Sequence, residues 1–149
     1  FPPIDVLPSL SRLMKNGIGE GKTRKDHSEI SNQMYASYAH GKELRELVAV
    51  IGEESLGETD KLHLKFADDF EKTFLNQSSS RERSIEESLS KAWELVSTLP
   101  TTELKRITAG FIQKYYRKQG SADEDKTDKD GADQAKTQDQ DGPERSQAP

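Results

Sequence analysis

The sequence predicts a mainly α-helical protein, in which a small antiparallel helical bundle follows an irregular N-terminal arm and precedes a disordered acidic tail. Apolar residues recur every three or four positions over residues 26–115, which is the period of a helix face. Proline and glycine interrupt residues 1–25, and residues 119–149 contain no Val, Ile, Leu, Met or aromatic residue. A chain of 149 residues has room for one such domain.

The N-terminal arm, residues 1–25, contains residues that break helices or allow unusual backbone angles: Pro2, Pro3, Pro8, Gly17, Gly19 and Gly21. The apolar stretch at residues 4–7 is compatible with a strand or the end of one. No convincing alternation of apolar and polar residues follows residue 10, so helices are predicted for the rest of the folded region.

The first predicted helix begins at Asp26, because Asp26 and Glu29 have the spacing of a capping box. Its apolar face consists of Ile30, Met34 and Tyr38. We expect a break at Gly41, after which the helical pattern resumes over residues 42–51. Gly52 lies where a glycine commonly ends a helix.

Three further helices are predicted after Gly52. Residues 59–75 carry apolar side chains at four-residue spacing: Leu62, Phe66, Phe70 and Phe74. Ser84 and Glu87 form a second capping box, and Pro100 ends the helix that follows them. The last helical stretch carries Leu104, Ile107, Phe111 and Tyr115. We expect the aromatic stripe and Trp93 to form the core rather than a ligand pocket.

Charge is distributed unevenly along the chain. Residues 119–149 hold nine of the 27 acidic and four of the 22 basic residues, so this tail carries the whole net charge of −5. A segment with no apolar surface to bury is predicted to be disordered, either as a solvating tail or as an interaction tail. The balanced charge of the preceding residues argues against nucleic acid as a partner.

Several kinds of site are not expected from the composition. The sequence has no cysteine, and no apolar run approaches the ~18 residues that a membrane span requires. His27, His40 and His63 do not have the spacing of a metal site. We therefore expect no metal site and no direct membrane insertion, and we expect His40 and His63 to be solvated or to lie at an edge.

A glycine-rich segment, residues 19–23 (GEGKT), ends like a phosphate-binding P-loop. The full pattern requires a glycine five residues before Gly21, where this chain has Asn16. It also requires a buried strand before the loop and a helix that begins at Lys22, and neither is predicted. A small P-loop NTPase is thus disfavoured, and the segment is interpreted as a turn that wraps around a partner surface.

Residues 1–14, FPPIDVLPSLSRLM, resemble the segment YPPIDVLPSLSRLM in the B subunit of archaeal-type ATP synthases and vacuolar-type ATPases. Residues 19–27, GEGKTRKDH, resemble the GEGKTREDH stretch of that family. The likeness extends over about residues 1–118 and includes residues 66–71, 74–77 and 104–107. The alpha subunit of the bacterial and mitochondrial enzymes has a related SVSR segment but lacks the GEGKTREDH continuation.

This resemblance implies a domain organisation. Residues 1–24 would be the end of a central α/β nucleotide-binding-like domain, residues 25–118 the C-terminal helical bundle, and residues 119–149 a tail that family members usually lack. Most of the central domain and the β-barrel of the full subunit would be absent from this chain. The family's B subunit is regulatory and lacks a working P-loop.

The resemblance also implies partners and a location. In the family, three B subunits alternate with three catalytic A subunits around a rotating central stalk. The expected partners are therefore the catalytic A subunit, the central stalk and the peripheral stalk. The expected location is peripheral, at the cytoplasmic face of the cell membrane, with the archaeal type favoured over the vacuolar membrane.

Arg12, with Ser11 beside it, is the catalytic residue that the resemblance implies. Arg12 matches the arginine of the family's SLSR segment, which reaches across the interface to the γ-phosphate held by the catalytic subunit. A planar, permanently charged guanidinium suits the stabilisation of charge on a transferring phosphoryl group. ATP or ADP with Mg²⁺ would then lie at the interface with the catalytic subunit, and this chain alone would bind no cofactor.

The turn at residues 52–60 resembles the rotor-facing loop of this superfamily, whose acidic form reads DELSEED. The residues expected to contact the central stalk are Glu53, Glu54, Leu56, Glu58 and Asp60, whereas Gly57 departs from the pattern. From the residues alone, the simpler interpretation is a polar connection in which Thr59 or Asp60 caps the next helix.

Two functions of different classes are therefore predicted. The first is the C-terminal part of the non-catalytic, regulatory B subunit of a proton-translocating rotary ATP synthase or ATPase, which couples ATP synthesis or hydrolysis to ion transport. In that case the chain is not an enzyme by itself. The alternative is a free-standing helical protein-interaction module without nucleotide chemistry.

Overall fold

The computed structural model describes residues 3–9 and 11–117, and these residues are mainly helical with no strand among them. The predicted helical class is therefore confirmed. The stretch at residues 4–7, which was compatible with a strand, forms bends and turns instead. The predicted acidic tail, residues 119–149, lies outside the described residues.

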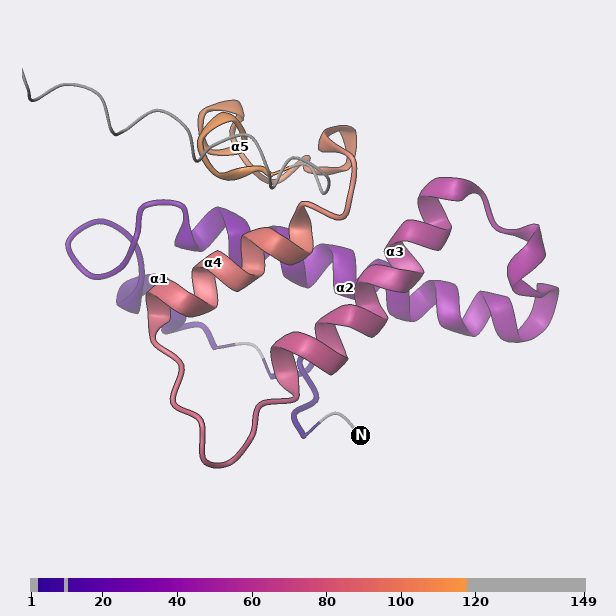
Figure 1. Cartoon of the computed structure of the whole chain (residues 1–149), viewed down its shortest axis with the longest axis horizontal. Helices are drawn as coiled ribbons and strands as arrows, with labels where there is room; N and C mark the ends of the chain where they lie inside the picture. Colours follow the sequence, from indigo (N-terminus) through magenta and orange to yellow (C-terminus); the bar gives the residue numbers. More distant parts are fainter. Residues whose placement is uncertain (1–2, 10, 118–149) are drawn as a thin grey trace, which may run out of the picture.

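The centre of the molecule is a hairpin of two antiparallel helices (Figure 1). The long helix α2 (His27–Ile51) and helix α3 (Glu58–Asp69) are joined by a short 3₁₀ turn, η1 (Glu53–Ser55). Helix α3 continues directly into a π-helical segment, η2 (Phe70–Leu75). This hairpin supplies the largest interface of the fold and places η1 at one end of the long axis.

One further helix packs directly against the hairpin. The helix α4 (Ile85–Val96) packs against α2 and η2. A 3₁₀ turn, η3 (Thr101–Glu103), leads to the short helix α5 (Ala109–Tyr115), and the arm contains one helical turn, α1 (Met14–Gly17). Figure 1 places α1 and the hairpin turn η1 at opposite ends of the molecule.

Gly41 does not break α2, contrary to the sequence prediction. The helix is continuous through Gly41. The glycine has another role there, because α2 and α3 approach each other closely at this position. A Cβ atom there would lie 2.5 Å from the Cβ of Ala67 and 2.6 Å from the carbonyl oxygen of His63. The glycine is therefore required by packing between helices. Gly52, in contrast, ends α2 as predicted, with φ +81° and its N–H donating to the carbonyl of Val48.

One of the two predicted capping boxes is confirmed. Ser84 Oγ accepts from the Glu87 N–H at 3.1 Å, and Glu87 Oε2 accepts from the Ser84 N–H at 2.7 Å. The prediction for Asp26 and Glu29 is wrong, because neither side chain caps α2. Glu29 Oε2 instead accepts from the N–H of Thr108, which ties α2 to the residue before α5.

The aromatic stripe forms the core as predicted, although the helix that carries it changes type. Phe66 and Phe70 are buried, Phe74 stacks on Phe70 at 5.3 Å between ring centroids, and Leu62 remains 38% exposed. From Phe70 onward the segment is π-helical rather than α-helical. Trp93 on α4 is also buried in this core.

The predicted last helix is shorter than expected. Leu104 and Ile107 are buried in the core, but they lie in a turn before α5, which begins at Ala109. Phe111 and Tyr115 belong to α5 and pack partly against the same core. Apolar spacing alone predicted the burial correctly, but it did not distinguish a helix from a buried turn.

Candidate functional site

Val6 and Leu7 attach the first part of the arm, which precedes Ser11 and Arg12, to the helical body. Both side chains pack against the core, and the Tyr35 hydroxyl on α2 donates to the carbonyl oxygen of Leu7 at 2.9 Å. This contact lies a few residues before the predicted site. It positions the arm while leaving the following turn exposed.

Ser11 and Arg12 lie in that exposed turn, immediately before α1. Ser11 Oγ accepts from the Leu13 N–H at 3.3 Å, and the Ser11 carbonyl accepts from the Met14 N–H at 3.3 Å. The Arg12 side chain is exposed and, within residues 3–9 and 11–117, its guanidinium has no hydrogen bond or ion pair. The geometry therefore leaves Arg12 free to reach a neighbouring molecule.

The glycine-rich segment after α1 closes on itself. The Gly19 carbonyl accepts from the N–H groups of Lys22 at 3.0 Å and Thr23 at 2.8 Å, and Thr23 Oγ1 accepts from the Gly19 N–H at 2.8 Å. The Lys22 ammonium donates to the Asn16 carbonyl, and α2 begins only at His27. These amide groups and this lysine are used within the turn, so the segment does not have the geometry of a phosphate cradle.

Asp26 joins the end of the arm to α4. Its side chain is fully buried and accepts from Arg24 at 2.6 and 2.8 Å and from Trp93 Nε1 at 2.6 Å. Burial by itself would raise the pKa of Asp26, but the hydrogen bonds from Arg24 and Trp93 outweigh it and lower the pKa. The Arg24 guanidinium also lies over the ring of Tyr115, 4.5 Å from its centroid.

This role of Asp26 was not predicted from the sequence, because its partners are distant along the chain. Trp93 lies 67 residues away, and no local spacing connects the two.

The predicted stalk-contact residues gather at the tip of the hairpin, but they do not all face solvent. Glu53, Glu54 and Glu58 are exposed. Leu56, which was expected to contact the stalk, is only 6% exposed. Its side chain is therefore buried, whereas those of the three glutamates lie on the surface of the tip.

Asp60 and Glu58 have partners within the hairpin. Asp60 Oδ1 lies 3.4 Å from His40 Nε2, and Glu58 pairs with Lys61 at 3.0 Å. Neither Thr59 nor Asp60 caps α3, whose N-cap position is Gly57. Glu53 and Glu54 are therefore the tip carboxylates without a partner among the described residues.

Exposed apolar side chains accompany the tip carboxylates. Leu47, Val50 and Ile51 at the end of α2 are 43%, 83% and 45% exposed. Acidic and apolar groups thus occur together at this end of the molecule, whereas α1, which begins two residues after Arg12, lies at the other end (Figure 1).

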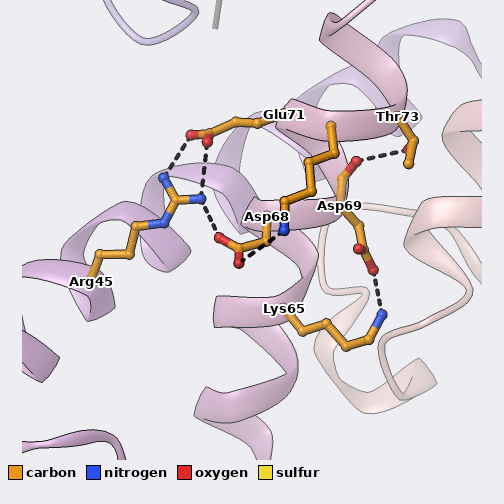
Figure 2. Close-up of polar contacts among 7 residues, drawn as sticks. Arg45, Lys65, Asp68, Asp69, Glu71 and Thr73 are labelled. Carbon is orange, nitrogen blue, oxygen red and sulfur yellow. Dashed lines mark hydrogen bonds and ion pairs between the residues drawn. The ribbon is translucent and has the colours of Figure 1, made fainter. Parts of the chain in front are cut away.

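A cluster of charges clamps the hairpin together away from the tip (Figure 2). Arg45 on α2 donates to Glu71 at 2.7 and 3.1 Å and to Asp68 at 2.5 Å. The Tyr38 hydroxyl donates to the same Glu71 carboxylate at 2.8 Å. Burial and the hydrogen bond to Glu71 raise the pKa of Tyr38 to about 12.

His63 is buried, contrary to the prediction that it is solvated or at an edge. Its side chain is 5% exposed, its ring lies against that of His40 with centroids 4.8 Å apart, and its Nδ1 has no hydrogen-bond partner among the described residues. His63 Nε2 lies 3.7 Å from a carboxylate oxygen of Glu103. Burial, followed by the charge of His40, lowers the pKa of His63.

Neither a metal-binding cluster nor a membrane-spanning helix occurs in the part of the chain that the structure describes. Its His, Asp and Glu side chains form no group of three or more with the geometry to hold an ion. None of its helices combines the length and apolar character needed to cross a membrane.

Comparisons with known proteins find matches over most of this chain. The family described as the C-terminal domain of V and A type ATP synthase matches residues 16–116. The B subunit of the A-type ATP synthase of Methanopyrus kandleri is 59% identical over 118 residues, and that of Aeropyrum pernix is 61% identical over 118 residues. Each alignment covers 79% of this chain, but only 12% and 26% of those proteins.

A solved structure gives the same result at the level of the fold. The ATP synthase subunit NeqB from Nanoarchaeum equitans matches with a TM-score of 0.60 and 42% identity, over 67% of this chain and 25% of that one. This chain therefore spans about a quarter or less of the relatives that it matches. Because the family match extends over most of the chain, the protein belongs to the family of C-terminal domains of V and A type ATP synthases.

Proposed function

We propose that this chain acts as the C-terminal part of a non-catalytic, regulatory B subunit in a rotary ATP synthase or ATPase. The observation that carries the proposal is its 59–61% identity, over 118 residues, to proteins named as the B subunit of A-type ATP synthases. In this role the chain is not an enzyme by itself. It contributes to a proton-translocating complex that couples ATP synthesis or hydrolysis to ion transport.

The proposed chemical contribution is Arg12, supplied in trans to a neighbouring catalytic A subunit, with Ser11 holding the turn. The exposure of Arg12 and the absence of a partner for its guanidinium among the described residues support this role. Nucleotide and Mg²⁺ would be held by the catalytic subunit at the shared interface. This chain would add a planar cation where charge develops on the γ-phosphate, and it would take no proton.

The proposed mechanical contribution is the hairpin tip, which would touch the central stalk. Glu53, Glu54 and Glu58 are exposed there next to apolar side chains, so contact would combine bulk packing with weak, screened attraction. Exposed ion pairs each contribute little, so specific salt bridges are not required. The peripheral stalk completes the proposed partners, and the proposed location is the cytoplasmic face of the cell membrane.

Substitution of Arg12 in an assembled complex that contains this chain tests the proposed chemistry. Arg12→Ala is expected to lower ATP hydrolysis on the order of 10³-fold while the complex still assembles, because an arginine finger contributes about 10³–10⁵ in rate. Arg12→Lys is not expected to restore turnover, since an ammonium lacks the planar fork of donors.

Lys15→Ala is the matched control, because Lys15 is another exposed cation on the same arm. It is expected to leave hydrolysis unchanged. Hydrolysis by Arg12→Ala within tenfold of the unsubstituted complex would rule out the assignment of Arg12.

The alternative function is a free-standing helical protein-interaction module without nucleotide chemistry. The exposed apolar residues at the hairpin tip favour it, since they can pack against the apolar face of a helix from another protein. Co-purification of the chain with catalytic A subunits and nucleotide-dependent assembly would support the B-subunit role. A chain that forms no complex with A subunits, even together with the stalk, would favour the free-standing module.

A further inference from the structure

A small cavity with cationic walls lies between the end of the arm, α4 and α5. Its volume is about 230 Å³, and its lining includes the cations Arg24, Lys114 and Arg117. Trp93 and Tyr115 give it aromatic walls, and their ring centroids are 5.4 Å apart. One carboxylate, Glu94, also lines it. The cavity is separate from both Arg12 and the hairpin tip.

Two of the cations that line this cavity lie over the ring of Tyr115. The guanidinium of Arg24 and the ammonium of Lys114 lie 4.5 and 5.0 Å from the centroid of the Tyr115 ring. Arg24 is fixed there by its two hydrogen bonds to Asp26.

Lys114 and Arg117, in contrast, have no carboxylate partner among residues 3–9 and 11–117. Lys105, nearby in the sequence, does have one, because its ammonium lies 3.5 Å from a carboxylate oxygen of Glu103. The cavity therefore has two available positive charges beside a fixed third.

The sequence that follows the cavity is complementary to it in charge. Residues 104–117 contain four basic residues and no acidic one, whereas residues 123–133 contain six acidic and two basic residues. Asp123 is the sixth residue after Arg117. Six residues extend to roughly 20 Å at most, so the acidic segment can reach the cavity from its point of attachment.

We propose that Lys114 and Arg117 at this cavity bind the acidic segment 123–133 of the same chain, with one or two of its carboxylate side chains in the cavity and the rest of the segment outside it. Covalent attachment favours this occupant over an acidic segment of another protein, because a short linker gives an effective concentration in the mM range. The contacts are exposed, so each is weak and the binding is reversible. The bound segment neutralises the cationic surface beside the arm. The proposal does not depend on the rotary function.

Nuclear magnetic resonance of the full chain tests the proposal directly. The chain has a single tryptophan, so Trp93 gives one indole N–H signal from the cavity wall. In Lys114→Gln/Arg117→Gln, the amide signals of residues 123–133 and the Trp93 indole signal are expected to shift. In the matched control Lys105→Gln/Arg106→Gln, which removes the same charge outside the cavity, these signals are expected to stay in place.

Salt provides a second measurement that needs no substitution. At about 1 M NaCl, where the Debye length is about 3 Å, the amide signals of residues 123–133 are expected to move to those of a synthetic peptide 119–149. Neutralising the segment with Asp123→Asn/Glu124→Gln/Asp125→Asn should shift the Trp93 signal, whereas Asp139→Asn/Asp141→Asn should not.

Three outcomes would overturn the proposal. The first is a set of tail signals that already equals the free peptide at low salt. The second is an equal response to the two double substitutions, which indicates attraction without a site. The third is a Trp93 signal that responds to added poly-glutamate but not to neutralisation of residues 123–125, which makes the occupant an acidic partner and not the tail.

Discussion

The absence of one Cβ atom sets the distance between α2 and α3. Gly41→Ala is expected to destabilise the fold by about 1–3 kcal/mol, because the new methyl group would lie within 2.6 Å of both Ala67 and the His63 carbonyl. The carbonyl belongs to the backbone, so relief requires the helices to separate. Urea unfolding followed by circular dichroism gives the free energy of unfolding.

Gly110→Ala is the control for this substitution, because Gly110 lies in α5 and a Cβ there meets nothing within 4 Å. Alanine at that position should stabilise the helix by about 0.5–1 kcal/mol. Equal effects of the two substitutions would show that the close approach at Gly41 does not limit packing.

His63 makes stability depend on pH in a defined direction. Because burial lowers its pKa below the usual 6.5, the unfolded chain binds more protons than the folded chain when the pH falls below 6.5. The stability is therefore present above pH 6.5 and is lost as the pH falls toward the folded-state value. Asp60, Glu103 and His40 are the charged groups that face this ring.

Urea unfolding at pH 7.5 and 5.5 checks this expectation. The unsubstituted chain should lose more stability between the two values than His63→Gln does. The pKa of His27 is also lowered, mainly by burial, but His27 is present in both proteins and its contribution cancels. A loss of the same size in both proteins would assign the effect to other groups.

Single residues were the level at which sequence patterns were least reliable. Asp26 matched a capping box, but the protein uses its carboxylate for Arg24 and Trp93. His63 was expected to be solvated or at an edge, but it is buried against His40 of α2. In both cases a tertiary contact decides the environment of the side chain, and such a contact is not encoded in neighbouring residues.

At the scale of elements, the Arg45 clamp holds α2 to the junction between α3 and η2. A double-mutant cycle with Arg45→Met and Glu71→Gln is expected to give a coupling free energy of about 1–2 kcal/mol, because the pair is bidentate and partly buried. The same cycle with Lys65→Met and Asp69→Asn should give less than about 0.5 kcal/mol, since Lys65 is 66% exposed.

A coupling for the Arg45 pair no larger than for the Lys65 pair would show that the clamp does not stabilise the hairpin. Figure 2 shows both pairs: Arg45 reaches from α2 to Glu71 on η2, whereas Lys65 and Asp69 both lie on α3. The two pairs therefore differ in burial, in the number of hydrogen bonds and in whether they join two elements. Each cycle is measured by urea unfolding of four proteins: the unsubstituted chain, the two single variants and the double variant.

Helix positions could be predicted from the sequence wherever periodicity and caps agreed. The Ser84–Glu87 capping box predicted where α4 starts, since the helix begins at Ile85, directly after the N-cap residue Ser84. The π-helical turn η2 could not be predicted, because Phe66, Phe70 and Phe74 have the spacing of a continuous α-helix. Gly41 misled the prediction because a glycine in a helix interior indicates a break unless its packing partner is known.

At the scale of the whole molecule, the hairpin tip lies at one end of the long axis (Figure 1). A cysteine introduced by Glu54→Cys should cross-link to the central stalk in an assembled complex, because Glu54 is exposed at that tip. Leu56 is unsuited to this experiment, since it is buried. Yield of the stalk product after oxidation is the measurement.

Glu82→Cys is the control for cross-linking, because Glu82 is exposed in the loop before α4 and not at the tip. It should give no stalk product. The absence of a product from Glu54→Cys in every rotary state, or equal products from both cysteines, would refute the stalk contact. For the candidate site, the resemblance to a known family suggested Arg12 and the tip residues, and their roles stay predictions. The fold adds which of the tip residues face solvent.

The exposed apolar side chains have a consequence for the isolated chain in solution. Those of Leu13 and Met14 are exposed in the arm and that of Ile85 at the start of α4, whereas those of Val50 and Ile51 are exposed at the tip. A molecule with different apolar patches at its two ends can associate head to tail, through a heterologous interface. Such interfaces give open filaments unless the rotation between neighbouring molecules closes a ring. Concentrated preparations of the chain should therefore grow as oligomers of graded length, and detergent or a capping partner at either end should stop that growth.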